Sequence, residues 1–145
     1  MTYNIDLEEK INYSLCLADL NISSYTTNSV FTISNQTGNI SFTENTGVIT
    51  FPAGRYMCEA FPYVDVSSTS DQIKFSWQKY QSGVYVDVGL EGQIQVVGDI
   101  VGEKDGAISV IDTDVDIDVR LIITDSTIAG TVTDVGGFIR IWKEG

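Results

Sequence analysis

Short apolar runs separated by turn residues recur along the chain, and this pattern constrains its fold more than any other feature. Residues 38–66 show it best, with apolar runs at 40–42 and 48–51 and a long apolar run from residue 55 onward. Pro52-Ala53-Gly54 separates the last two runs. Proline presets φ and glycine permits positive φ, so this tripeptide favours a tight turn. The stretch therefore predicts three strands joined by turns.

The rest of the chain continues this pattern. Apolar and polar residues alternate over residues 73–79, 84–88 and 112–124, and two more apolar runs lie at 128–133 and 137–142. Such alternation is typical of strands with one buried face. About ten short strands with frequent turns and no long helix predict an all-β sandwich or barrel, and the absence of a fixed repeat argues against a propeller or solenoid.

The length of 145 residues suits one domain. A composition of 43% hydrophobic and 19% charged residues is typical of a globular protein. We expect residues 13–145 to form a single β-sandwich domain. Residues 1–12 mix charge with apolar side chains, which suits either an arm that docks on a partner or a simple lead-in segment.

Charge and residue usage exclude several function classes. The formal net charge of −12 argues against binding to nucleic acid or to an anionic membrane, since both require clustered Lys or Arg. It favours a basic partner or bound cations. The chain has no histidine, which removes Ser-His-Asp and Cys-His catalysis and the commonest zinc ligand. Catalysis by a pair of carboxylates survives this test, but with 20 acidic residues a suitably spaced pair would arise by chance. We therefore assign no catalytic residue and expect no enzymatic activity.

The two cysteines, Cys16 and Cys58, are too few for a disulfide scaffold. Two buried free thiols and one bridge between them are both compatible with the sequence. The residues that follow Met1 lack the basic and apolar regions of a secretory leader, and no apolar run reaches the roughly 20 residues that span a bilayer. We expect synthesis in a cytoplasm.

The run from residue 55 to residue 61 is apolar on both faces of its predicted strand. Tyr56, Cys58 and Ala60 share one face, while Met57 and Phe61 occupy the other. A strand that is apolar on both faces needs cover on both. Either another part of the same chain or a neighbouring subunit supplies the second cover.

Four aspartates alternate with other residues in Asp112-x-Asp114-x-Asp116-x-Asp118. On one strand their carboxylates would stand on one face, about 6.6–6.8 Å apart. Carboxylate oxygens suit a hard cation such as Ca²⁺, so these residues are candidate metal ligands. The alternative is a solvated face, because acidic side chains on an outer strand discourage aggregation.

Three tyrosines are candidates for a surface that binds a glycan, namely Tyr63, Tyr80 and Tyr85. Tyr80 and Tyr85 flank the predicted turn at residues 81–83, where cross-strand aromatic packing is the alternative role. Trp77 shares a strand face with Ile73 and Phe75 and is expected in the core.

Three segments resemble a known jelly roll. They are Asn39 to Phe42 leading through Gly47 into Phe51-Pro52-Ala53-Gly54-Arg55-Tyr56, the region 73–100, and Gly136-Gly137-Phe138-Ile139. Over residues 36–145 they resemble the jelly roll of tumour necrosis factor and the complement globular heads. The form is similar to the divergent copies found in bacteriophage head and tail appendage proteins.

This resemblance implies a homotrimer, in which Met57, Phe61 and Tyr56 would lie at the interface between subunits. It allows a Ca²⁺ site near the trimer apex and implies no other cofactor. It predicts a phage virion structural protein that decorates or stabilises the capsid, made in the host cytoplasm and bound to the major capsid protein or another virion protein. The alternative is a receptor- or glycan-binding tip of a tail or head fibre.

Overall fold

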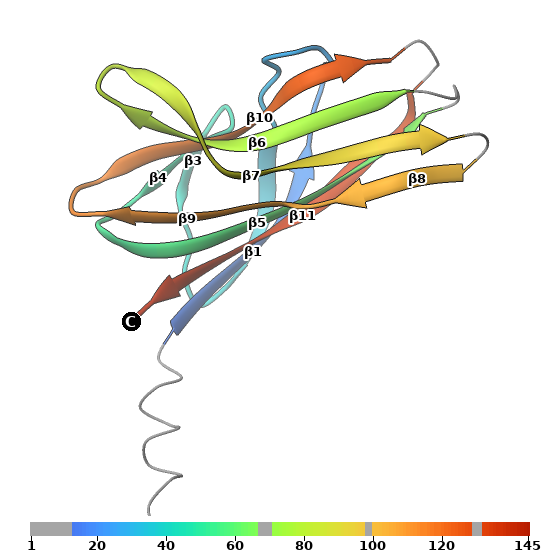
Figure 1. The fold of residues 1–145 in the computed structure, drawn as a ribbon. Coiled ribbons are helices and arrows are strands. Elements are labelled where there is room, and N and C mark those ends of the chain that lie inside the picture. Colours follow the sequence, from blue (N-terminus) through green and yellow to red (C-terminus); the bar gives the residue numbers. More distant parts are fainter. Residues whose placement is uncertain (1–12, 67–70, 98–99, 129–131) are drawn as a thin grey trace, which may run out of the picture.

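Antiparallel strands in two layers make up the part of the chain that the computed structural model describes, which is residues 13–66, 71–97, 100–128 and 132–145 (Figure 1). Eleven strands occur in these ranges, and every pairing between them is antiparallel. The predicted all-β sandwich of about ten strands is therefore confirmed. The predicted arm, residues 1–12, lies outside the described residues. No helix capable of crossing a membrane is found among the described residues.

One layer, sheet A, contains five strands in the order β2-β1-β11-β5-β9. Their bounds are Thr32–Gly38, Tyr13–Asn21, Val132–Glu144, Gly54–Val66 and Ala107–Thr113. The other layer, sheet B, has the order β7-β6-β10-β4-β3, with β8 paired to β7. Its strands are Val84–Val97, Gln72–Gln81, Ile117–Thr127, Val48–Phe51, Thr43–Asn45 and Ile100–Asp105. The two layers join at one edge, where Leu90 of β7 pairs with Ile108 of β9.

The predicted turn between β3 and β4 is explained by the backbone conformation of its two central residues. Thr46 and Gly47 both have positive φ, 51° and 89°, and Asn45 pairs with Val48 across them. This is the geometry of a two-residue hairpin, whose twist matches that of the flanking strands. A Cβ at Gly47 would lie 2.4 Å from the carbonyl oxygen of Phe31, so the close approach of that segment also requires glycine.

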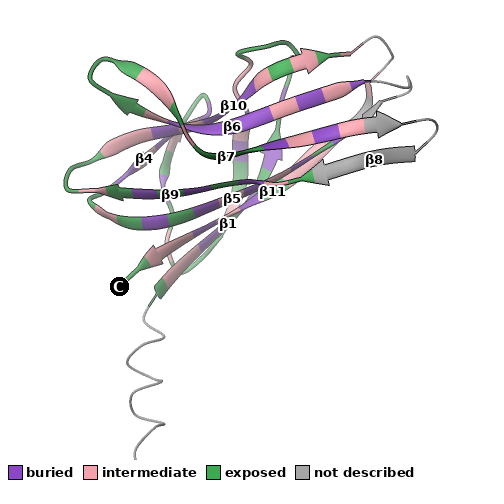
Figure 2. Ribbon diagram, viewed as in Figure 1, coloured by how far each residue is buried: buried purple, intermediate pink, exposed green. Residues whose placement is uncertain are grey.

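The core lies between the inner faces of the two sheets (Figure 2). Trp77 and Phe75 of β6 are fully buried there, as predicted for Trp77. The Trp77 indole Nε1 donates a hydrogen bond to the carbonyl oxygen of Ala107 on β9, at 3.2 Å. Because β6 and β9 belong to different sheets, this bond links the two layers through the core.

The placement of Tyr56 corrects the sequence prediction. Its side chain is 1% exposed and packs against Phe51, with ring centroids 4.5 Å apart, so it does not lie on an outer surface. Its hydroxyl donates to the carbonyl oxygen of Pro52 at 2.7 Å. Burial, assisted by the negative charge of Asp116, raises the pKa of Tyr56. Strand alternation explains the error, because Tyr56 shares the inward face with Cys58 rather than the outward face with Met57.

Both cysteines are buried free thiols. Cys16 on β1 and Cys58 on β5 both pair with Ile141 of the intervening strand β11. Two strand spacings place them about 10 Å apart, which exceeds the reach of a disulfide. Burial raises the pKa of the Cys58 thiol, as expected of a small apolar core residue.

We expect Tyr56→Phe to lower the free energy of unfolding by about 1 kcal/mol, because the Pro52 carbonyl loses its donor while the ring packing is kept. Urea denaturation followed by fluorescence measures this change. Tyr80→Phe is the matched control, since Tyr80 is 45% exposed and water can replace its contacts. Equal stability of Tyr56→Phe and the unchanged protein would contradict this role of the hydroxyl.

Candidate functional site

The outward face of sheet A carries most of the exposed large apolar side chains among the described residues. Seven of the eleven such side chains lie on its strands: Tyr13, Leu17, Met57, Tyr63, Ile108, Val110 and Phe138. We call this surface the sheet A face. Isolated exposed apolar residues are ordinary, whereas a contiguous group marks an interaction surface.

Strand register arranges the sheet A face in rows. Leu15 pairs with Trp142, Trp142 with Met57, and Met57 with Val110. Directly opposed residues of antiparallel strands project to the same side. These four side chains therefore form one apolar row across four strands.

The next row holds a charged pair at its centre. Leu17 and Ile108 lie at its ends, with Arg140 and Glu59 between them. Arg140 Nη2 donates to Glu59 Oε2 at 3.0 Å, and Trp142 Nε1 donates to Glu59 Oε1 at 3.0 Å. Both carboxylate oxygens thus have a donor, and the Glu59 side chain is only 16% exposed. When water is removed from this part of the face, the Glu59 carboxylate therefore keeps a hydrogen-bond donor for each oxygen.

Aromatic side chains continue the sheet A face beyond the charged row. Phe61 and Phe138 face each other with ring centroids 5.2 Å apart, and the Arg140 guanidinium lies 5.4 Å from the Phe61 ring. Met57 is 46% exposed and Phe61 is partly buried, so both lie on the outward face as predicted.

Three hollows indent the same surface. One of about 230 Å³ is bordered by Met57 and Trp142, one of about 310 Å³ by Phe61 and Tyr63, and one of about 560 Å³ by Leu17. The exposed ion pair between Arg55 and Glu144, at 3.6 Å, lies at one end. An apolar centre with a polar rim is typical of a protein–protein interface.

The four aspartates do not share one strand face, so that prediction is wrong. Strand β9 ends at Thr113 and β10 begins at Ile117, which puts Asp114 and Asp116 in the connecting turn. Asp112 belongs to sheet A, whereas Asp118 belongs to sheet B and accepts a hydrogen bond from Thr50 Oγ1 at 2.9 Å. No group of three or more metal-ligating side chains is found among the described residues. The argument from one shared strand face therefore no longer applies, and Ca²⁺ binding by these residues stays a prediction.

The three candidate tyrosines do not form one site. Tyr63 lies on sheet A, whereas Tyr80 and Tyr85 lie opposite each other on sheet B, with ring centroids 5.1 Å apart. The Arg120 guanidinium covers the Tyr85 ring at 3.7 Å. Burial and the nearby charge of Asp118 raise the pKa of Tyr85, against the opposing effect of Arg120. The pair therefore packs across the strands, and 45% of Tyr80 remains exposed.

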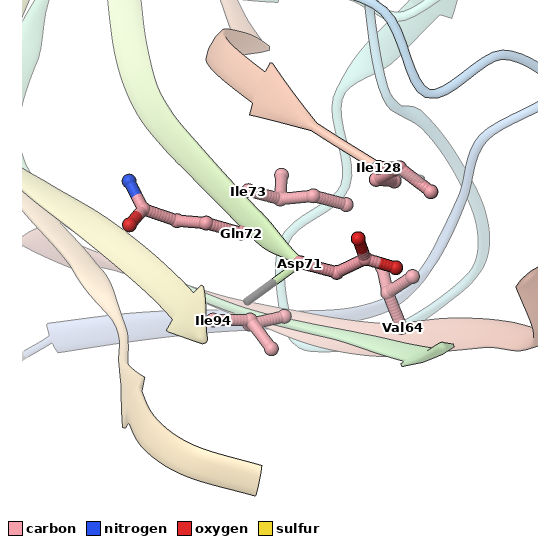
Figure 3. A pocket seen from close by; sticks show the side chains of 6 residues that line it. All are labelled: Val64, Asp71, Gln72, Ile73, Ile94 and Ile128. Carbon is pink, nitrogen blue, oxygen red and sulfur yellow. The ribbon is translucent and has the colours of Figure 1, made fainter. Parts of the chain in front are cut away.

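A small cavity at one end of the sandwich holds a buried carboxylate (Figure 3). Asp71 is 2% exposed, and its carboxylate points between Val64 and Ile128, away from the amide of Gln72. The cavity volume is about 10 Å³, which corresponds to about one water molecule. It is too small for a substrate or cofactor.

Several residues of the sheet A face were missed by sequence reasoning. They are Tyr13, Leu15, Leu17, Val110, Arg140 and Trp142. The alternation of residues 137–142 could have indicated an outward Trp142. The pairing of Arg140 with Glu59 could not have been found, because the two are 81 positions apart in the chain.

Comparison of the whole structure with solved structures identifies the fold. Murine APRIL at pH 5.0 superposes with a TM-score of 0.61 at 12% identity, over 91% of this chain and 99% of that chain. The globular domain of zebrafish complement 1qA superposes with a TM-score of 0.59 at 11% identity, over 90% of this chain and 96% of that chain. The chain is a jelly roll of the tumour necrosis factor and complement globular-head type. At these identities the likeness concerns the fold alone.

Comparisons of the sequence alone give no match. No protein-family model matches this chain. No curated protein matches it either. Any functional assignment to this jelly roll must therefore come from its own surface and from the short motifs that it carries.

We expect Glu59 and Arg140 to be energetically coupled. A double-mutant cycle of Glu59→Ala and Arg140→Ala, measured by urea denaturation, should give a coupling free energy of about 1 kcal/mol. The exposed pair Arg55 and Glu144 is the matched control and should give a coupling near zero. Equal coupling free energies in both cycles would show that the Glu59–Arg140 pair stabilises the fold no more than an exposed surface pair does.

Proposed function

We propose that this protein is a non-enzymatic virion structural protein, a homotrimeric jelly roll that decorates or stabilises a bacteriophage capsid. The observation that carries the assembly part of the proposal is the sheet A face. The virion part is supported by the resemblance of residues 51–56 to phage appendage proteins. In this proposal the protein resides in the virion after synthesis in the host cytoplasm.

The physical case for assembly begins with exposed apolar area. Met57 and Val110 are 46% and 52% exposed and oppose each other in one row, and Phe138, 45% exposed, lies two rows away on the same face. Complete burial of a side chain of this kind stabilises by about 1.5–3 kcal/mol, so half-burial of several in one contact is a substantial driving force. A protein partner that excludes water from the apolar row would be stabilised by this free energy of apolar burial.

Charge supports a second copy of the chain as that partner. The chain carries 20 acidic and 8 basic residues, so most contacts between two copies would bring like charges together. The centre of the sheet A face avoids this, because the charges of Glu59 and Arg140 compensate each other within one subunit. Copies can associate there without electrostatic repulsion at the contact. The family resemblance then implies that three copies assemble.

The acidic outer surface of such a trimer favours a basic docking region on the major capsid protein or on another virion protein. Long-range attraction between surfaces of opposite charge speeds their encounter. Cosedimentation with capsids that lack this protein tests the decoration role. We expect saturable binding that weakens as salt concentration rises. Absence of binding to any capsid or virion component would overturn the decoration role.

A second candidate, a receptor- or glycan-binding tip, is favoured by the exposed Tyr80 ring. It lies beside a polar network in which Gln78 Nε2 donates to Asp87 and Arg120 Nε donates to Gln78. A glycan array separates the two functions. Binding that Tyr80→Ala abolishes, together with failure to bind capsids, would favour the tip.

We expect Met57→Asp to convert the trimer to monomers, because it places a carboxylate in the centre of the apolar row. Light scattering after size-exclusion chromatography measures the mass. Val84→Asp is the control, since Val84 is 58% exposed on the opposite sheet. A monomer before any substitution, or a trimer that survives Met57→Asp, would overturn the role of the sheet A face.

A further inference from the structure

The hollow bordered by Phe61 and Tyr63 lies beyond the charged row, and neither function proposed above makes use of it. Its volume is about 310 Å³, which is in the range of pockets that bind small molecules. One chain supplies all of its lining residues, so a single subunit carries the complete hollow.

Three aromatic side chains line this hollow, namely Phe61, Tyr63 and Phe138. Phe61 and Phe138 oppose each other across β5 and β11, and their ring planes are inclined by only 32°. Tyr63 and Phe138 are 38% and 45% exposed, so part of each side chain is open to an incoming group. The face of an aromatic ring carries partial negative charge and attracts a cation.

Two glycines keep the space between these side chains open. A Cβ at Gly106 would lie 2.6 Å from Cε1 of Phe61, and a Cβ at Gly137 would lie 2.4 Å from the Phe61 carbonyl oxygen. Gly137 also has a φ of 116°, which other residues rarely adopt. A side chain at either position would displace Phe61, so the shape of the hollow depends on both glycines.

The charges around the hollow favour a cationic ligand. Asp105 borders it and is exposed, so its carboxylate is available to a bound cation. The Arg140 guanidinium lies 5.4 Å from the Phe61 ring, but Glu59 compensates its charge at 3.0 Å. The net charge of −12 attracts cations to the protein as a whole and repels anions.

The aromatic lining selects among cations. A metal ion such as Ca²⁺ requires six to eight oxygen ligands, and one carboxylate cannot supply them. A quaternary ammonium ion has no N–H group to satisfy, and its charge is spread over methyl groups that can contact aromatic rings. It therefore matches a hollow with aromatic walls and one carboxylate at the border.

We propose that this hollow binds a quaternary ammonium group of the kind that choline carries. The methyl groups contact the rings of Phe61, Tyr63 and Phe138, and the Asp105 carboxylate compensates the positive charge. This site goes beyond the functions proposed above, since it requires neither a capsid nor a second subunit.

Titration with choline chloride, followed by the chemical shifts of the protein, tests the site. Neohexanol is the matched ligand, because it has the shape of choline with a neutral carbon in place of the nitrogen. We expect choline to bind about tenfold more tightly than neohexanol, through its attraction to several rings. Equal affinities would mean that the hollow selects only for apolar shape, and that result would overturn the proposal.

Two variants separate the contribution of the rings from that of the carboxylate. Phe138→Leu keeps an apolar side chain but removes the ring, so choline should bind about two- to fivefold more weakly while neohexanol binding is unchanged. Asp105→Asn should weaken choline binding by a similar factor, about two- to fivefold. Tyr80→Leu is the control on sheet B and should bind choline as the unchanged protein does. Unchanged choline binding in both Phe138→Leu and Asp105→Asn would contradict the assignment.

The same titration on Met57→Asp separates this site from the trimer. Residue 57 lies two rows from Phe61 on β5, so the substitution leaves the hollow intact. Choline binding by this variant would support the site whatever the oligomeric state of the protein. Absence of binding would overturn the site, while the mass of the unchanged protein decides the trimer independently.

Phosphatidylcholine vesicles present the same group on a lipid and distinguish its two sources. Choline binding without vesicle binding would identify a free ligand. Cosedimentation with the vesicles that Phe138→Leu weakens would identify the lipid headgroup. Failure to bind either choline or the vesicles would overturn the proposal.

Discussion

The alternation of strand β5 is the constraint on which the rest of this structure depends. Its inward side chains, Tyr56, Cys58 and Ala60, are at most 1% exposed and pack into the sandwich core. Its outward side chains include Met57 and Phe61, which no described part of the chain covers fully. When a strand has two apolar faces, folding buries one face in the core, and the other remains available for contact with a partner. The fold and the proposed assembly therefore depend on the same thirteen residues.

The ion pair on the sheet A face explains how an apolar surface can hold charge and still lose water. Glu59 accepts hydrogen bonds from Arg140 and from Trp142, so its desolvation on association adds little cost. The same network fixes the Trp142 ring within the apolar row. Arg140 Nε is buried and has no hydrogen-bond partner among the described residues, so the guanidinium is held through Nη2.

Much of the fold could be predicted from the sequence, because period-two alternation and turn residues are local signals. The β3–β4 hairpin and the burial of Trp77 follow from them. The turn between β9 and β10 could not be found in this way. Asp112 to Asp118 alternate without interruption and contain neither glycine nor proline, so the pattern looks like one strand. Only the sandwich, which places β9 and β10 in different sheets, requires a turn there.

The sheet A face could be predicted only in part, for a similar reason. Alternation identified Met57 and Phe61, but their neighbours come from β1, β9 and β11, which only the sheet order brings together. Leu90 is the sharpest case, since in the sequence it follows an alternating strand and precedes Glu91-Gly92 without any distinguishing signal. Its place beside Ile108 depends on the crossing of β7 from one sheet toward the other. Local pattern therefore decides which side of its own strand each residue takes, while topology decides which residues become neighbours on the sheet A face.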